Sequence, residues 1–376
     1  MSPTVQSSNN RNTSGRLAFL DWMRGFAVLI ILQGHVFDSF SRDDLRPRGP
    51  YLFSQFMGGI APAVFLFLTG VTLAFIIDKR ERRGFTPLQR LRVGLSRGGY
   101  LLMLAFLFRA QMWLFGYPFS GWRDLLKVDV LNLMGVTIAA LSLTALVSTR
   151  ERVRIAAIIG TAVAALSPLV SAGNWTWLPE AVSDYFVPNL THFAFFPWAS
   201  FIAFGLSAGS ILRLTRGEDV GRVMQWAMLI GIAMVVGGEY FANAGWSIYD
   251  KADFWLNSPA MVTIKMGVLL IMLSLAFLWC EYGAMGKWSW VRQLGTTSLI
   301  VYWVHIELVY GRWFWFFKGN LNTMQCVTCA GLLMAAMLGL SLLRTRWPDA
   351  VRLFRLRYPS MAAWTGSLDP QRASGD

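Results

Sequence analysis

Residues 60–77 read IAPAVFLFLTGVTLAFII, an apolar run without a charged side chain. A helix needs about 20 such residues to cross the hydrocarbon core of a bilayer. Working outward in both directions, we find apolar segments of similar length along the whole chain. Ten predicted spans result, at residues 17–38, 52–77, 96–117, 128–148, 153–172, 193–213, 223–243, 258–280, 294–316 and 323–343. The sequence therefore predicts an all-α polytopic membrane protein with about ten transmembrane helices.

The composition favours the same fold class. Of the 376 residues, 55% are hydrophobic and 15% are charged, whereas an average soluble domain has roughly 25% charged residues. A soluble protein of this length could not hide so much apolar surface. The three cysteines, Cys280, Cys326 and Cys329, are too few for a disulfide framework. Cys326 and Cys329 have C-x-x-C spacing in an apolar stretch, and we expect them to be buried helix residues.

The basic residues predict the orientation in the membrane. The net charge is +13, but Lys and Arg lie in short runs between apolar segments, so we expect no nucleic acid partner. With the N-terminus in the cytoplasm, 23 of the 34 Lys and Arg residues fall on the cytoplasmic side and 7 on the other. Positive residues favour the cytoplasmic side, so both termini are expected there. We expect a disordered tail at 1–14, a transmembrane domain at 15–343 and a basic cytoplasmic tail at 344–376.

The first predicted span carries three ionisable residues on one face: Asp21, Arg24 and His35. Arg24 and His35 are eleven residues apart, which places them about 20° apart around a helix and roughly 16 Å apart along it. An ionisable group in hydrocarbon costs at least ~2.5 kcal/mol and usually faces a cavity or a partner. The spacing leaves two interpretations open: a functional face, or an Asp–Arg pair that fixes the helix beside an interfacial histidine.

The ninth predicted span repeats the pattern. Ser298, Tyr302, His305 and Arg312 follow the spacing i, i+4, i+7, i+14, which forms one polar stripe on a helix. Such a stripe indicates a cavity filled by water or substrate, although a histidine with a nearby tyrosine also fits a satisfied hydrogen bond in the protein core.

Further polar residues fall in the outer half of the predicted membrane domain. They include Asn132 in the fourth span and His192 at the start of the sixth. Lys265 needs an acidic partner there, and Glu239 on the preceding span is the expected one. We expect no metal site, because no two histidines lie at zinc-ligand spacing and no cysteine is nearby. Neither a glycine-rich phosphate loop after a strand nor a G-x-S-x-G elbow is present.

Residues 16–25 read RLAFLDWMRG, and His35 follows Arg24 by eleven residues. This stretch resembles the first helix of membrane acyltransferases, both the bacterial families that modify surface sugars and the heparan-α-glucosaminide N-acetyltransferase-like family. Later segments are more similar to the second group, in the same order over most of the chain. They are APAVFLFLTG at 61–70, DVLNLMG at 129–135, FPW at 196–198 with Gly205, SP at 258–259, and GTTSLIVYWVH at 295–305.

The resemblance implies acyl transfer from cytoplasmic acyl-CoA, or a related donor, to a glycan, lipid or small molecule on the far side of the membrane. His35 would be the general base, or would carry the acyl group itself. The residues expected to hold the oxyanion or to orient the acceptor are Tyr302, His305 and Asn132.

The same resemblance suggests a binding path for the donor. A coenzyme's phosphates would suit the basic entrance to the third span, where Arg90, Arg92 and Arg97 lie. Residues 90–92 also look like the R-x-R of related acyltransferases. The pantetheine arm would then run along the Asp21 and Arg24 face toward His35.

The chain departs from the family pattern at two places. Related sequences often carry an acidic residue where this chain has Gly34, and a histidine near Gly58 and Gly59. These departures keep two other functions open: a non-catalytic member of the same fold that moves or binds a lipid or sugar, and a structural subunit of a membrane complex. We expect a multi-pass protein of a bacterial inner membrane, with membrane lipid as a partner; a homodimer is left open.

The predicted orientation can be tested with single cysteines in a cysteine-free background. Thr86→Cys should resist an impermeant thiol reagent in intact cells, because loop 78–97 is expected on the cytoplasmic side. Ser183→Cys in the predicted outer loop 173–192 should react. Labelling of Thr86→Cys in intact cells would reverse the assignment of sides.

Overall fold

The computed structural model describes residues 17–357, apart from 119, 245–246, 250–251 and 284–287. The predicted tail at 1–14 and the end of the predicted C-terminal tail, 358–376, lie outside the described residues. The longer helices are α1 Ala18–Phe40, α2 Gly49–Gly58, α3 Ala61–Glu81, α4 Pro87–Gly116, α5 Val130–Leu141, α6 Thr149–Ala172, α8 Phe195–Leu214, α9 Val220–Ala242, α10 Pro259–Leu278, α12 Ser298–Tyr310 and α13 Thr323–Arg357. Two short helices complete the set, α7 Glu180–Ser183 and α11 Trp290–Thr296.

The expected fold class is confirmed: the protein is an all-α polytopic membrane protein. Within the described residues, nine helical segments are long and apolar enough to cross a membrane, and no strand is present. The ninth predicted span, 294–316, does not form one helix. It is divided between α11 and α12, and α12 has only 13 residues, about 20 Å of helix.

The break between α11 and α12 has a local cause. Thr297 has non-helical backbone angles, φ −118° and ψ 20°, within a run of three hydroxyl residues at 296–298. Such side chains compete with helical hydrogen bonding. The Thr297 hydroxyl donates to Ser341 on α13 at 2.6 Å, so the interrupted backbone is packed against protein rather than lipid. The predicted polar stripe also ends early, because Arg312 lies beyond α12 and donates to the carbonyl oxygen of Phe115.

Three other boundaries differ from the predicted spans. The second span is interrupted at 59–60, between α2 and α3. Helix α4 begins at Pro87 instead of residue 96, because Thr86 and Gln89 form a capping box at its N-terminus. Helix α13 continues beyond residue 343 to Arg357, so the predicted tail begins as helix.

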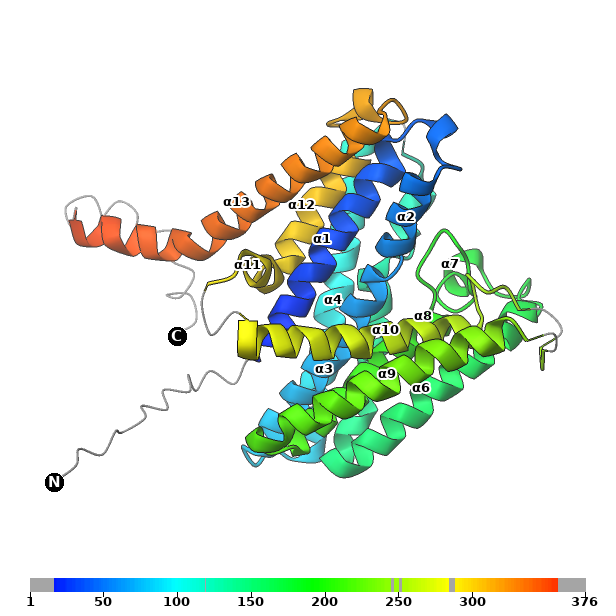
Figure 1. Ribbon diagram of the computed structural model, residues 1–376, viewed down its shortest axis with the longest axis vertical. Helices are drawn as coiled ribbons and strands as arrows, with labels where there is room; N and C mark the ends of the chain where they lie inside the picture. Colours follow the sequence, from blue (N-terminus) through cyan, green and yellow to red (C-terminus); the bar gives the residue numbers. More distant parts are fainter. Residues whose placement is uncertain (1–16, 119, 245–246, 250–251, 284–287, 358–376) are drawn as a thin grey trace.

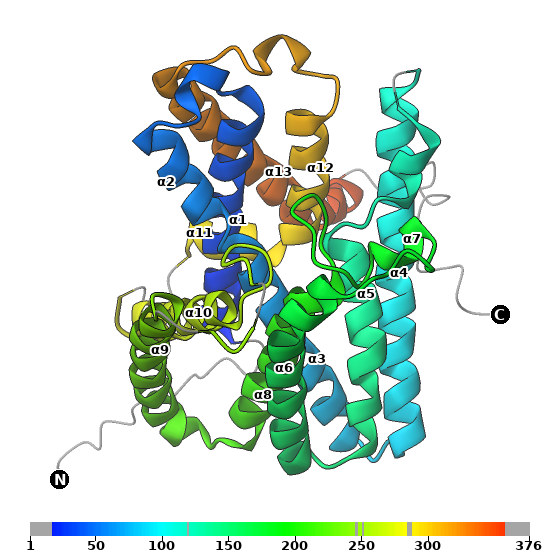
Figure 2. The ribbon, with the colours of Figure 1, turned by 90° about the vertical axis from the view of Figure 1, so that its right-hand side faces the viewer.

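The helices form two groups around a common core (Figures 1 and 2). Figure 2 shows α1, α2 and α12 in the upper part of the molecule and α3, α6 and α8 in the lower part. The main hydrophobic core joins buried side chains of α1, α3, α5, α6, α8 and α10. Helices α3 and α8 pack especially closely: a Cβ added to Gly205 would lie 1.9 Å from the Phe67 carbonyl oxygen. Small residues of this kind let membrane helices approach.

This close approach makes Gly205 a test of the α3–α8 contact. Gly205→Ala should lower stability by about 2–3 kcal/mol, because the new methyl group overlaps backbone that cannot easily move. Gly237→Ala on α9 is the matched control, since a Cβ there would meet no atom within 4 Å. Thermal unfolding of the purified variants measures the difference. Equal stability of the two variants would contradict the packing.

Candidate active site

His35 on α1 and His305 on α12 meet at the centre of the site. Their Nδ1 and Nε2 atoms are 3.1 Å apart. The two rings are stacked with centroids 5.2 Å apart and an angle of 17° between their planes. The fold thus brings together two histidines that the sequence singles out on separate helices.

The hydrogen bonds of His305 fix the protonation of both rings. His305 Nδ1 lies 2.7 Å from the carbonyl oxygen of Val301, which can only accept, so this nitrogen carries the proton. In the neutral ring the His305 Nε2 is then an acceptor, and His35 Nδ1 must be the donor. The proton of neutral His35 is therefore on Nδ1, and its Nε2 keeps a free lone pair.

The free nitrogen of His35 is accessible, unlike the ring of His305. His305 is only 1% exposed, whereas His35 is half-buried. No described residue bonds to His35 Nε2, and this atom is not among the fully enclosed polar atoms that lack a partner. The lone pair is therefore unpaired within the described residues and not fully enclosed, so it can take a proton from a hydroxyl or an amine that reaches it.

Aromatic and acidic residues lie beside His35 toward the C-terminal end of α1. The Tyr310 ring meets His35 edge-on, with centroids 5.2 Å apart, and its hydroxyl donates to Asp38 Oδ2 at 2.8 Å. Tyr51 donates to the other oxygen of Asp38 at 3.4 Å. Lys318 donates to the Tyr310 carbonyl oxygen at 2.7 Å, and partial burial lowers the pKa of this lysine. The sequence could have indicated Asp38 as a neighbour of His35, because it follows His35 by three residues, about one turn of α1.

Tyr302 joins the histidine pair from α12. Its ring meets that of His305 edge-on, with centroids 5.8 Å apart. The predicted grouping of Tyr302 with His305 therefore corresponds to a contact in the structure.

Asn132 lies in a neighbouring cluster and makes no hydrogen bond to the histidines. Its amide nitrogen donates to the Tyr185 hydroxyl at 3.1 Å, and its oxygen accepts from the Asp129 backbone at 3.1 Å. Burial raises the pKa of Tyr185, which keeps its hydroxyl proton in place. Asp129 in turn pairs with Arg109 at 3.3 Å. The sequence spacing gave no sign of the Arg109–Asp129 pair, because its members lie on different helices.

At the other end of α1, Asp21 and Arg24 form the ion pair that the sequence suggested as one alternative. Arg24 Nη1 lies 3.0 Å from Asp21 Oδ1, and Arg24 Nη2 donates to the Thr72 hydroxyl at 3.4 Å. This pair ties α1 to α3 on the same face as His35.

The three arginines expected at the donor entrance have different environments. Arg90 is buried and pairs with Glu81 at 2.6 Å, while Arg92 and Arg97 are exposed. Glu81 also binds Arg152 at 3.2 Å, and Arg152 is completely buried. One carboxylate therefore holds two guanidinium groups where the ends of α3, α4 and α6 meet.

His192 and Lys265 each have a partner away from the histidine pair. His192 lies in the connection before α8, where its Nε2 is 3.1 Å from Asp184, and it makes no hydrogen bond to either histidine of the pair. The expected pairing of Lys265 with Glu239 is wrong. Lys265 lies over the Trp198 ring at 4.8 Å, and Glu239 accepts instead from the Asn243 side chain. An aromatic face stabilises a cation, and sequence depth alone could not distinguish it from a carboxylate.

The two departures from the family pattern lie side by side. A Cβ added to Gly34 would lie 3.1 Å from the Gly58 Cα atom. Helices α1 and α2 cross at this point, and the space that larger side chains would need is filled by backbone. The glycines are thus a matched pair that sets the approach of α2 to the helix carrying His35.

The comparisons with known proteins agree with this architecture. Residues 17–344 match the model of a family described as an acyltransferase domain. Because the match covers nearly the whole transmembrane region, the chain belongs to this family of membrane acyltransferases. A search of curated proteins found no match. Among the described residues, no group of three or more His, Cys, Asp or Glu side chains could hold a metal ion.

The shared carboxylate predicts a stability effect. Glu81→Gln should destabilise the protein by about 3 kcal/mol, because it leaves Arg90 and Arg152 buried without a counter-charge. Glu218→Gln, at an exposed carboxylate between α8 and α9, should change little. The midpoint of thermal unfolding measures both. A Glu81→Gln variant as stable as the control would show that the arginines do not depend on this carboxylate.

Proposed function

We propose that the protein transfers an acyl group from cytoplasmic acyl-CoA to an extracytoplasmic glycan, lipid or small molecule, with His35 as general base. The observation that carries this proposal is the hydrogen-bond chain from His35 through His305 to the Val301 carbonyl oxygen. This chain keeps the His35 ring neutral, with Nδ1 hydrogen-bonded to His305 and the Nε2 lone pair available to accept a proton. Membership of the acyltransferase family provides the reaction class.

The reaction would use both protonation states of His35. The coenzyme A thioester supplies the acyl group and a thiol leaving group. His35 Nε2 takes the proton of the acceptor's hydroxyl or amine as that group attacks the thioester carbonyl carbon. The carbon–sulfur bond then breaks, and the proton on Nε2 passes to the departing sulfur. The same nitrogen could instead carry the acyl group between two transfers.

His305 acts in this proposal as a positioning residue. Its Nε2 accepts the Nδ1 proton of His35 and so holds the ring with Nε2 toward the open side. When His35 is protonated, the same bond stabilises the imidazolium. Tyr302 packs against His305 and is a proposed ligand of the oxyanion or the acceptor, whereas Asn132 would act only through the neighbouring cluster.

The donor would enter from the end where α3, α4 and α6 meet. The exposed Arg92 and Arg97 fit a coenzyme's phosphates, because exposed guanidinium groups can bind phosphate oxygens bidentately. Arg90 would contribute charge from its buried pair with Glu81. The Asp21–Arg24 pair lies roughly 16 Å along α1 from His35, on the face that the pantetheine arm would follow. The resemblance to the heparan-α-glucosaminide N-acetyltransferase-like family favours an acetyl group, and a bacterial inner membrane is the proposed location.

The catalytic role is tested by a substitution that separates the two nitrogens of His35. In His35→Asn the amide nitrogen can replace Nδ1 as donor to His305, but nothing replaces the Nε2 lone pair. The rate of acyl transfer from labelled acyl-CoA, measured with purified protein and candidate sugar acceptors, should fall about 10²–10⁴-fold. Thermal stability should stay near that of the wild type. Full turnover by His35→Asn would contradict the proposal.

The positioning role of His305 has its own test. His305→Ala should lower the rate by roughly 10–100-fold, the range typical when the partner that orients a functional histidine is lost. His305→Gln should recover much of this loss, because its amide oxygen can accept from His35 Nδ1. If His305→Gln is as inactive as His305→Ala while His35→Asn is active, the base is His305. If all variants retain full function in cells, a transport or binding role replaces the enzyme.

A further inference from the structure

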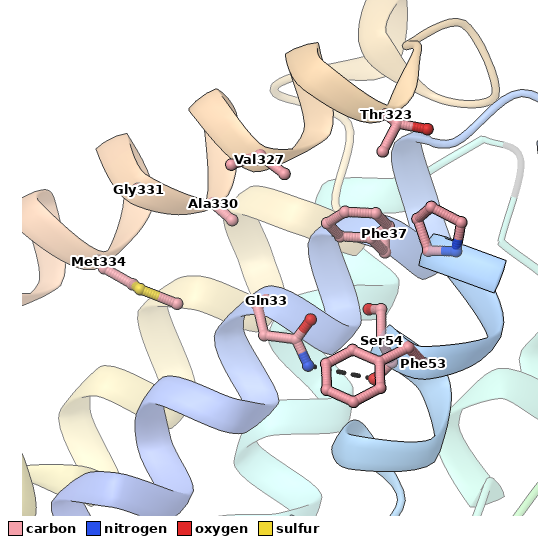
Figure 3. A pocket seen from close by; sticks show the side chains of 10 residues that line it. Gln33, Phe37, Phe53, Ser54, Thr323, Val327, Ala330, Gly331 and Met334 are labelled. Atoms are coloured by element: carbon pink, nitrogen blue, oxygen red, sulfur yellow. Dashed lines mark hydrogen bonds between the residues drawn. The ribbon is translucent and has the colours of Figure 1, made fainter.

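A surface groove of about 460 Å³ lies between α1, α2 and α13, away from the histidine pair (Figure 3). Its walls are mostly apolar and include Phe37, Phe53, Val327 and Met334. All three helices belong to segments long and apolar enough to span the membrane, Ala18–Phe40, Gly49–Glu81 and Thr323–Arg346. The groove therefore opens sideways, toward the lipid.

Two polar groups interrupt this apolar surface. The Ser54 hydroxyl is enclosed and has no hydrogen-bond partner, although Ser54 is only 2% exposed. Gln33 points into the groove beside it (Figure 3), with its amide nitrogen donating to the Ser54 carbonyl oxygen at 3.1 Å. A buried hydroxyl without a partner costs about 1–3 kcal/mol, so Ser54 is a donor suited to a ligand carbonyl.

A cation lies close in the chain to one wall of the groove. Arg48 directly precedes α2, two residues before Pro50 on the groove wall. The two neighbouring arginines are paired, Arg42 with Asp44 and Arg46 with Asp43. Within the described chain Arg48 has no such ion pair and is exposed. The charge suits an anionic group at the membrane surface.

We infer that this groove binds one anionic glycerophospholipid. An acyl chain lies along Phe37 and Val327, an ester carbonyl accepts from the Ser54 hydroxyl, and the phosphate lies near Arg48. A helix of a second copy suits the groove poorly, because a helix about 10–12 Å wide with 1.5 Å rise per residue would place only about three or four residues in 460 Å³. This inference does not depend on the proposed acyl transfer, because the groove and the histidine pair lie on different faces of α1.

Gly331 provides a way to fill the groove without disturbing the helices. It lines the groove on α13, and a Cβ added there would meet no atom within 4 Å. Gly339, further along the same helix, is equally unobstructed but does not line the groove. Gly331→Leu and Gly339→Leu are therefore a matched pair of variants.

The test is native mass spectrometry of delipidated full-length protein titrated with phosphatidylglycerol or phosphatidylcholine. Wild type and Gly339→Leu should bind one phosphatidylglycerol with equal affinity, and Gly331→Leu about tenfold more weakly, a difference of about 1.4 kcal/mol. Arg48→Gln should remove the preference for phosphatidylglycerol over phosphatidylcholine. Ser54→Ala should weaken both lipids.

Three results would overturn the inference. Equal lipid binding by Gly331→Leu and Gly339→Leu would show that lipid does not occupy the groove. Loss of a dimer specifically in Gly331→Leu would assign the groove to a second copy of the chain. If Arg48→Gln still prefers phosphatidylglycerol over phosphatidylcholine, Arg48 does not bind the lipid phosphate.

Discussion

The carbonyl oxygen of Val301 determines the state of both histidines in the site. Because it can only accept, it fixes the proton of His305 on Nδ1, and the bond between the rings then fixes the proton of His35. In water such an arrangement would be one of several tautomers. Inside the membrane domain an unsatisfied or charged imidazole is costly, so the hydrogen-bond chain selects one neutral state with a single free nitrogen.

That bond depends on how closely α1 approaches its neighbours. A Cβ added to Gly295 on α11 would lie 1.8 Å from the Asp21 carbonyl oxygen, and Gly34 packs against Gly58 on α2. These contacts hold α1 along its length, with His35 beside α12. The ion pairs near Asp21 and Glu81 fix the opposite end of the helix group. Backbone packing therefore positions the site, while buried charges hold together the end through which the donor is proposed to enter.

The sequence predicts the membrane fold and singles out the two histidines that the fold brings together, for a physical reason. Apolar runs and isolated ionisable residues are local signals, and His35 and His305 each lie on a polar face that periodicity detects. The bond between them is not local, since 270 residues separate the two rings. The hydroxyl residues at 296–298 indicate the break of the ninth span at Thr297. Hydropathy averaged over a 20-residue window does not detect so short a polar run.

The arginines at the proposed donor entrance show which contacts the sequence alone does not predict. Arg90 and Arg92 are equivalent as basic residues after a membrane span, yet the structure buries the first with Glu81 and exposes the second. Likewise, an aromatic ring and a carboxylate are equally plausible neighbours for Lys265 until the helices are packed. Which side chains meet between two helices depends on how each helix is rotated about its axis and how deep each residue lies in the membrane. Composition and periodicity do not determine either.

Nitrogen NMR of the protein with ¹⁵N-labelled histidine measures the central assignment directly. The chain has three histidines, and a His192→Gln variant leaves only the pair. The account predicts that both remaining rings are neutral, with the proton on Nδ1 and an unprotonated Nε2 in each. A proton on Nε2 of His35 would contradict it, because the nitrogen proposed to act as the base would then have no free lone pair.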